Sequence, residues 1–522
     1  MRRYSRSFAV VGALALALLT AGGAGAGRDR AGEAVGGRIT PALAALVAQA
    51  RPDAQLRVIV EGGGAAAAVA AHGHVHRQLG FDGGVAATVR AGELERLASQ
   101  PGVSFVAPDA PVQLTSTGSV SAASLATIYP GRDSAPNPWS AGATGQGVGI
   151  AVIDSGVTPS PDFGSRLTQV VLDGQVGSLD DTVGHGTMVA GVAAGNSPDG
   201  RFIGIAPGAN VYAININRPT GVYTSDVITA LKWVFDNAHA YNIRVVNLSL
   251  TETVQSSYKT SPLDLAVERL WASGVFVAVS AGNLGPGQID YAPANDPLVF
   301  SVDAFDTMDT SGPGDDTLST WSSSGTTVDG FVKPDLVAPG RHIAAPLPAG
   351  TLLDLQAPLG NRVAPGYASI NGTSFAAPQV AGAAAVIFQW HPDYSPDNVK
   401  WVLIAKQGAK PKNSKIGALS LSSSYNLGGT PGRANQGVPA LVCAPGSTCL
   451  TDTTIASAWD SSSWNSASWN SASWNSASWN SASWNSTTTW DSASWNSFSW
   501  NSASWNSTSW NATLLGAFDL WS

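Results

Sequence analysis

The stretch GVGIAVIDSG, residues 147–156, decides the fold, because its apolar residues do not alternate with polar ones. A strand with one face in water shows such alternation, whereas a strand buried on both faces reads as a continuous apolar run. Three later stretches have the same character: NVYAINI at 210–216, IRVVNLSL at 243–250 and GVFVAVSAGN at 274–283. The pattern therefore predicts a parallel sheet that is covered by helices.

Two stretches among these runs have the apolar spacing of helices, SDVITALKWVFDNAHAYN at 225–242 and LDLAVERLWASG at 263–274. Strands that alternate with helices predict an α/β domain with a doubly wound, mainly parallel sheet, which we place at 139–427. In such sheets the functional groups gather beyond the carboxyl ends of the strands. Polar residues follow three of the expected strands, and they are Asp154, Asn247 and Asn283.

The stretch NGTSFAAPQVAGAAAVIF, residues 371–388, reads as a buried helix of small apolar residues that opens with two hydroxyls. Proline costs least in the first helical turn, so the helix is expected to begin at Thr373 or Ser374. Either hydroxyl suits an N-cap, and Ser374 also suits a nucleophile, so this stretch alone leaves both interpretations open. A second helix of small residues is expected in GHGTMVAGVAAG, 184–195, with His185 at its start.

Three motifs follow one another along the chain: IDSG around Asp154, GHGT around His185 and GTSFAAP around Ser374. They resemble the three signatures of the subtilisin-like serine peptidases, in the chain order of that family, and the likeness covers about 139–425. The SAGN stretch that ends at Asn283 is similar to the family's oxyanion segment. The resemblance implies a serine endopeptidase with a subtilisin-like fold, in which Asp154, His185 and Ser374 form the triad and Asn283 stabilises the oxyanion.

The resemblance also implies which residues contact the substrate. They are Gly221 and Tyr223 on an edge that pairs with the substrate backbone, and Ser249, Leu250, Ala281 and Gly282 in the walls of the main specificity pocket. Thr251 departs from the family pattern, which commonly has Gly there. Asp290 and Tyr291 both remain candidates for the base of the pocket. No cofactor and no metal site is predicted. Members of the family often bind structural calcium, which therefore stays open although no EF-hand-like carboxylate cluster occurs.

The N-terminus has the features of a secretory signal. The basic stretch MRRYSRS precedes an apolar run at 8–19 and the small residues AGA at 24–26, so cleavage is expected after Ala26. The apolar run is too short for a transmembrane helix, and no later segment is long enough. Loss of the three arginines in residues 1–26 changes the formal net charge of −8 to about −11, and this acidic balance argues against nucleic acid as a partner.

Residues 51–112 predict a small α+β unit with the order βαββαβ, which fits a ferredoxin-like fold. Its stretches FDGGVAATV and LASQPGVSFVAPD resemble the inhibitory propeptide of the subtilisin-like family. The unit also carries His72, His74 and His76, which we interpret as solvated residues at a strand edge. Metal binding is the less favoured interpretation, because no cysteine or carboxylate cluster joins the three histidines.

The remaining segments are expected to link or extend these units. Residues 27–50 form an N-terminal segment, 113–138 a linker with the maturation site, and 428–451 a linker in which Cys443 and Cys449 form a disulfide. The tail, 452–522, is a repeat of WNSAS whose period fits either a stacked solenoid or a disordered segment. Its regular tryptophans suggest binding to sugars or cell-wall glycans.

The sequence thus predicts a secreted, extracellular endopeptidase that cleaves proteins or peptides, held at the cell surface if the tail binds there. It would be made as a precursor whose own propeptide inhibits it until the precursor cleaves itself. The alternative, from another class, is a surface-binding protein in which the tail is functional and the peptidase fold is a carrier.

Overall fold

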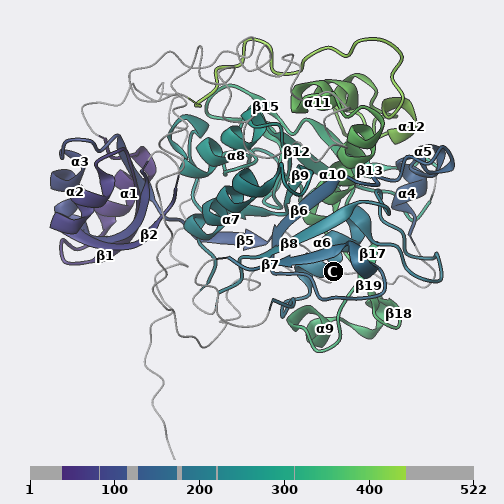
Figure 1. Cartoon of the computed structure of the whole chain (residues 1–522), viewed down its shortest axis with the longest axis horizontal. Helices are drawn as coiled ribbons and strands as arrows, with labels where there is room; N and C mark the ends of the chain where they lie inside the picture. Colours follow the sequence, from purple (N-terminus) through teal and green to yellow (C-terminus); the bar gives the residue numbers. More distant parts are fainter. Residues whose placement is uncertain are drawn as a thin grey trace, which may run out of the picture. The chain divides into compact units, whose positions relative to one another are not determined.

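The structure is a computed structural model that describes residues 38–80, 83–114, 127–172, 179–218, 221–310 and 312–442 (Figure 1). The expected signal sequence, the cysteine pair Cys443 and Cys449, and the WNSAS tail lie outside the described residues.

The central sheet has eight strands, in the order β13-β12-β11-β9-β6-β8-β7, and β16 pairs with β12 beside this path. The strands are β6 (Gly149–Asp154), β7 (Leu167–Val170), β8 (Asn210–Asn215), β9 (Ile243–Leu248), β11 (Phe276–Ser280), β12 (Phe300–Asp306), β13 (Thr317–Leu318) and β16 (Leu336–Pro339). All of these pairs are parallel except β12 with β13. The four apolar runs are β6, β8, β9 and β11, so the prediction of a mainly parallel α/β sheet is confirmed.

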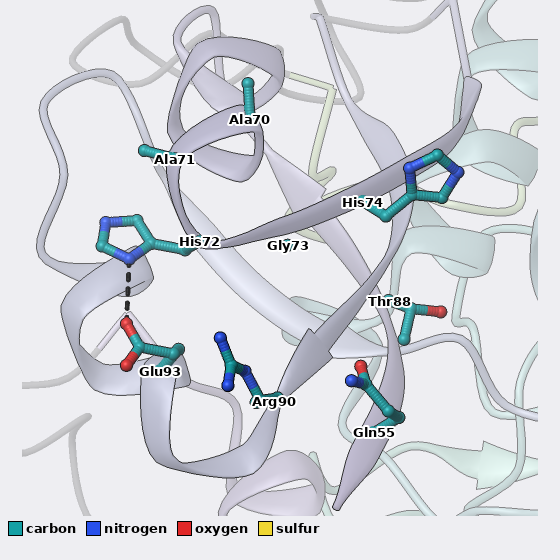
Figure 2. A pocket seen from close by; sticks show the side chains of 9 residues that line it. All are labelled: Gln55, Ala70, Ala71, His72, Gly73, His74, Thr88, Arg90 and Glu93. Carbon is teal, nitrogen blue, oxygen red and sulfur yellow. Dashed lines mark hydrogen bonds and ion pairs between the residues drawn. The ribbon is translucent and has the colours of Figure 1, made fainter. Parts of the chain in front are cut away.

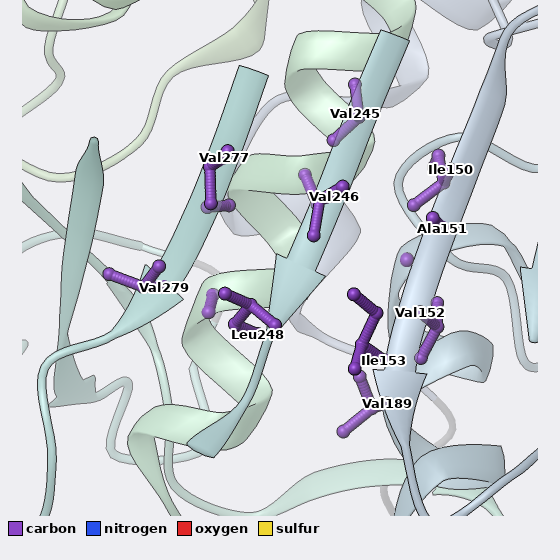
Figure 3. Close-up of a cluster of buried hydrophobic side chains, with 14 of the residues drawn as sticks. Ile150, Ala151, Val152, Ile153, Val189, Val245, Val246, Leu248, Val277 and Val279 are labelled. Carbon is purple, nitrogen blue, oxygen red and sulfur yellow. The ribbon is translucent and has the colours of Figure 1, made fainter. Parts of the chain in front are cut away.

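Two pairs of helices cover this sheet. Helices α6 (His185–Ala194) and α10 (Thr373–Trp390) pack against each other, as do α7 (Thr224–Asn237) and α8 (Pro262–Ala272). Figure 3 shows valines and isoleucines of β6, β9 and β11 in successive strands, together with Val189 of α6. All the labelled side chains are buried, and burial of apolar surface at about 25 cal/mol per Å² makes such a cluster the main stabilising term.

Helix α10 approaches its neighbours closely because of its small residues. A Cβ atom built on Gly382 would lie 2.7 Å from Cβ of Ile205 and 2.8 Å from the carbonyl oxygen of Ala193 in α6. No side chain larger than hydrogen fits there without displacement of backbone. Gly382 therefore sets how near α10 comes to α6, which carries His185.

The start of α10 differs from the sequence expectation. Gly372 is the N-cap, with φ of 144°, and no side chain caps the helix, so the interpretation of Thr373 or Ser374 as the N-cap is wrong. Pro378 lies inside the helix, beyond the first turn. Its missing N–H would leave the carbonyl of Ser374 without its helical partner. The hydroxyl of Ser249 donates to that carbonyl at 2.8 Å and so replaces the lost bond.

The N-terminal unit has its own hydrophobic cluster and a sheet in the order β2-β3-β1-β4, with the described pairs antiparallel. Its elements are α1 (Pro41–Gln49), β1 (Gln55–Glu61), α2 (Ala65–His72), β2 (Gly73–Gln78), β3 (Val85–Arg90), η1 (Ala91–Glu93), α3 (Leu94–Ala98) and β4 (Phe105–Pro108). The expected boundary at residue 51 is too late, because Leu43 of α1 is fully buried in this cluster. The alanine-rich sequence before residue 51 gave too weak a periodicity to reveal α1.

The main domain likewise packs beyond the expected limits of 139–427. Tyr129 and Ala440 both belong to its core, and Arg132 forms a buried ion pair with Asp316. The other elements are β5 (Val112–Leu114), α4 (Tyr129–Arg132), α5 (Pro136–Ser140), η2 (Gly164–Arg166), β10 (Leu250–Glu252), η3 (Tyr258–Thr260), β14 (Gly325–Thr326), β15 (Val332–Lys333), β17 (Ile343–Pro346), α9 (Leu352–Gln356), η4 (Leu359–Asn361), β18 (Arg362–Ala364), β19 (Tyr367–Ile370), α11 (Pro396–Ala405) and α12 (Leu421–Ser424).

We expect Gly382→Ala to lower the free energy of unfolding by about 1–3 kcal/mol, the usual cost of overpacking. Helix propensity alone favours Ala by about 1 kcal/mol, so a loss of stability would isolate the clash with α6. Denaturant unfolding in a Ser374→Ala background measures the effect without self-digestion. Gly360→Ala is the matched control, because a Cβ atom there meets nothing within 4 Å, and a comparable loss in this control would contradict the explanation.

Candidate active site

Asp154 is the last residue of β6, and its carboxylate is completely buried. The Oδ1 atom accepts hydrogen bonds from the backbone N–H of Ser155 at 2.7 Å and from Nδ1 of His185 at 2.8 Å. A carboxylate can only accept, so Nδ1 of His185 carries the proton. The Nε2 atom of the neutral ring is then an acceptor.

His185 is the first residue of α6, after Gly184, which has a left-handed φ of 98°. This φ favours glycine, and a Cβ atom on Gly184 would also lie 2.7 Å from the side-chain ends of Leu347 and Thr351, which would have to shift. The imidazole lies beside Phe375, the neighbour of Ser374, with 5.5 Å between ring centroids. Among the described residues, Nε2 of His185 has no hydrogen-bond partner.

Ser374 lies in the first turn of α10, and its hydroxyl donates to the carbonyl of Ser249 at 3.3 Å. Of the predicted triad, the hydrogen bond between Asp154 and His185 is therefore formed, whereas Nε2 of His185 is not bonded to Ser374. Such bonds are often absent without substrate and tighten when it binds. Asn247, at the end of β9, donates to Ser249 at 2.8 Å and so supports Ser374 indirectly.

Asn283 follows β11, and its Oδ1 accepts from the backbone N–H of Thr373 at 3.1 Å and from its hydroxyl at 2.9 Å. The backbone N–H of Gly282 donates to the same hydroxyl at 3.2 Å. Because the amide oxygen is held in this way, the NH₂ group is the end of Asn283 that remains to donate to a ligand. Sequence reasoning named Thr373 only as a candidate N-cap and missed that it holds Asn283.

Asp181 was also missed, and it organises the loop before His185. Its carboxylate accepts from the backbone N–H groups of Val183, Gly184 and Thr187 at 3.0, 2.7 and 2.8 Å. The hydroxyls of Thr187 and Ser155 add two further bonds at 2.8 Å. Burial raises the pKa of Asp181 to about 6, although these donors act in the opposite direction. An Asp that precedes a helix is a capping signal, which could have identified it.

The segments that carry the predicted substrate-binding residues lie on either side of β5, a strand of the chain itself. Strand β5 pairs with β10, so that Leu114 lies opposite Leu250 and Val112 opposite Glu252. On its other side, the backbone N–H of Val112 donates to the carbonyl of Val222 at 3.1 Å, between Gly221 and Tyr223. The structure thus brings Gly221, Tyr223 and Leu250 together around one extended segment.

The remaining predicted pocket residues are distributed as follows. Ala281 and Gly282 lie between β11 and Asn283, and both are buried or nearly so. Asp290 accepts a hydrogen bond from the backbone N–H of Val328 at 2.6 Å, so it is engaged in fixing a loop. Within the described ranges, no group of three or more His, Cys, Asp or Glu could hold a metal ion. No helix in those ranges is long and apolar enough to cross a membrane.

A separate pocket of about 480 Å³ lies on the N-terminal unit and contains none of the residues above (Figure 2). His72 and Glu93 face each other in it with 3.1 Å between Nδ1 and Oε2, and Gln100 lies 3.1 Å from the other ring nitrogen. His76 is bonded to Thr88. His72 ends α2 and only 15% of its side chain is exposed, so the interpretation of His72 as a solvated residue at a strand edge is wrong, whereas His74 is exposed on β2, an edge strand of its sheet.

Comparisons with known proteins place this geometry in a family. A profile described as "Subtilase family" matches residues 145–428, more than half of the chain. Serine protease AprX of Bacillus subtilis (strain 168) is 35% identical over 271 residues, which are 50% of this chain and 61% of AprX. Subtilisin Savinase of Lederbergia lenta is 33% identical over 265 residues, which are 51% of this chain and 84% of that protein.

Among solved structures, fervidolysin from Fervidobacterium pennivorans, a keratinolytic enzyme related to subtilisin, matches with a TM-score of 0.55. The match covers 71% of this chain and 61% of that chain at 22% sequence identity, which shows a common fold. Family profile, relatives and fold agree with the motifs around Asp154, His185 and Ser374. The chain therefore belongs to the subtilase family, and its main domain is a subtilisin-like serine-type endopeptidase.

Proposed function

We propose that the protein is a secreted serine endopeptidase that works through an acyl-enzyme and is made as a precursor that processes itself. The single observation that carries the proposal is the buried 2.8 Å hydrogen bond between Asp154 and Nδ1 of His185. This bond leaves Nε2 of His185 as a base, and His185 packs beside the α10 turn that carries Ser374.

In this mechanism the oxygen of Ser374 attacks the carbonyl carbon of the substrate while Nε2 of His185 takes the hydroxyl proton. The C–N bond then breaks and the same proton passes to the leaving amine. Water repeats the sequence on the acyl-enzyme and restores the serine. Asp154 holds the ring in the required tautomer and stabilises the imidazolium that forms.

Negative charge that develops on the substrate oxygen needs donors that are already in place. The amide NH₂ of Asn283 is one donor, because Thr373 holds the oxygen end of the amide. The backbone N–H of Ser374 at the start of α10 is the other, and the partial positive charge of the helix terminus adds to it.

The N-terminal unit is proposed to be an inhibitory propeptide with a ferredoxin-like fold, which its element and strand order support. Asp109 accepts from the backbone N–H and the hydroxyl of Ser225 in the first turn of α7, each at 3.0 Å. Arg77 donates to Asp226 of the same turn at 3.0 Å. With β5 lying between Val222 and β10, these contacts support a cleft that is occupied by the chain itself.

The export signal at 1–26, the disulfide between Cys443 and Cys449, and glycan or cell-wall binding by the tail remain predictions from the sequence. The rival function, a surface-binding protein with an inert peptidase fold, is separated from the proposal by the first prediction below.

Ser374→Ala is expected to abolish self-processing and to lower kcat by about 10⁶, the size of the loss in subtilisin itself, a member of the same family. The measurement is a gel of the purified precursor together with casein digestion. Ser369→Ala is the matched control, because Ser369 is equally buried and its Oγ has no hydrogen-bond partner among the described residues. Absence of maturation and digestion in the wild type as well would favour the rival function, whereas continued maturation and digestion by Ser374→Ala would contradict the role assigned to Ser374.

Asn283→Ala is expected to lower kcat with little change in KM, because the amide donates only when charge develops on the substrate oxygen. Subtilisin loses ~10²–10³ in kcat when its oxyanion-hole asparagine is replaced, and we carry that magnitude over from the family. Steady-state kinetics on a peptide substrate measure both constants. Asn361→Ala is the control, since Asn361 bonds to the backbone of Ser369. A rise in KM at unchanged kcat would contradict the assigned role.

The maturation cut is expected within two residues after Leu114. Leu114 lies opposite Leu250, and the next residue of that edge, Ser249, is the one that contacts Ser374. We therefore expect the bond that is cut to follow Leu114 closely in the sequence. N-terminal sequencing of the mature enzyme tests this, and a stable N-terminus closer to Asp133 would contradict it.

A further inference from the structure

Glu252, the last residue of β10, lies against the strand that occupies the cleft. It is directly opposite Val112 of β5, and opposite residues of an antiparallel pair point to the same side of the sheet. Val112 is buried and belongs to the apolar cluster of the main domain, which also contains Leu250 and Leu263. The side chain of Val112 thus fills an apolar pocket, and a carboxyl group stands beside that pocket.

The hydrogen bonds of Glu252 connect it to the occupying strand. Its Oε1 lies 2.7 Å from Oγ1 of Thr224, and that hydroxyl lies 3.0 Å from the carbonyl oxygen of Ala110. Thr224 has a single hydroxyl proton, so both bonds are made at once only when the carboxyl of Glu252 is protonated and donates. Burial, the largest cause, raises the pKa of Glu252 to about 8 in this state.

No cation compensates Glu252 in the part of the chain that the structure describes. The charged groups that act across the site are Asp109 and Asp264, which are both acidic. Thr224 and Ser225, at the start of α7, offer only uncharged groups. When the N-terminal strand leaves the cleft, a carboxyl group without a counter-charge is therefore exposed at the wall of an apolar pocket.

We propose that Glu252 is a specificity-determining residue that favours peptides with Arg or Lys at the position that Val112 occupies. The inference rests on the proposed endopeptidase function and names a substrate class for the same cleft. The aliphatic stem of Arg or Lys suits the apolar pocket, and its charged end would reach the carboxylate. A charge pair of this kind in a cleft discriminates strongly against a partner that lacks the charge.

The occupying strand itself has Val at this position, which leaves Glu252 protonated and without a counter-charge. An intramolecular segment does not need that interaction to bind, because its effective concentration is high. It also has to leave after cleavage. A substrate with a cation at this position would bind better than the released segment in this one pocket.

The test uses mature enzyme obtained from the full-length precursor and internally quenched peptides with the sequence of residues 110–117. The residue at position 112 of the peptide is Val, Arg or citrulline, the last being an uncharged isostere of Arg. We expect kcat/KM for the Arg peptide to exceed that for the citrulline peptide by about tenfold or more, and Glu252→Gln to reduce this ratio to about one. Asp236→Asn, in which the lost carboxylate pairs with Lys232 near the end of α7, is the matched control and should keep the wild-type ratio.

A wild-type ratio near one, or a high ratio that survives in Glu252→Gln, would overturn the proposal. If Glu252→Gln does not mature, Glu252→Asp is used instead. It retains the charge, so its ratio of kcat/KM for the Arg peptide to that for the citrulline peptide should stay clearly above one. The ratio measured on the wild type tests the proposal without any variant. Failure of the wild type to cleave any of the peptides would instead count against the endopeptidase function.

Discussion

The geometry of the site depends on one small set of hydrogen bonds around Thr373. Its backbone N–H and hydroxyl both donate to Oδ1 of Asn283, and the backbone N–H of Gly282 donates to the hydroxyl. These bonds join the end of β11 to the first turn of α10. One residue thereby fixes the orientation of the Asn283 amide, the proposed oxyanion donor, and the position of the neighbouring Ser374. All three residues are buried, so water does not compete for these bonds.

A second group of bonds holds His185, the proposed general base. Asp181 accepts hydrogen bonds from backbone N–H groups of the loop before α6 and of its first turn, and Asp154 fixes the tautomer of His185. The ring is thus positioned from the strand side and from the loop side before any substrate arrives. Ser374 is positioned differently, because its hydroxyl is engaged by the carbonyl of Ser249. The alignment that chemistry requires is therefore built in for the base, whereas the hydroxyl still has to exchange its partner.

The parallel sheet and the candidate catalytic residues were predictable because their signals are local. Apolar runs such as 147–156 mark buried strands, and Asp154 and His185 lie in motifs that can be read within a few residues. Glu252 escaped prediction because its role arises from Thr224, a partner that only the folded chain brings near it. Asp181 was overlooked although most of its partners lie within six residues of it in the sequence. The N-cap at Gly372 escaped for another reason. Two hydroxyls stood where a cap was expected, but both are used in contacts with β9–β11 segments rather than with their own helix.

Pro378 has a consequence that reaches beyond helix α10. Proline has no backbone N–H to donate, so the carbonyl of Ser374 accepts a hydrogen bond from the hydroxyl of Ser249 instead. Ser249 directly precedes β10. Ser249, which precedes the proposed peptide-binding edge, and Ser374, the proposed nucleophile, are thus joined by two hydrogen bonds, one from each hydroxyl. An extended ligand that pairs with β10 would therefore contact the same short segment that positions the proposed nucleophile, so that ligand binding and catalysis would depend on the same hydrogen bonds.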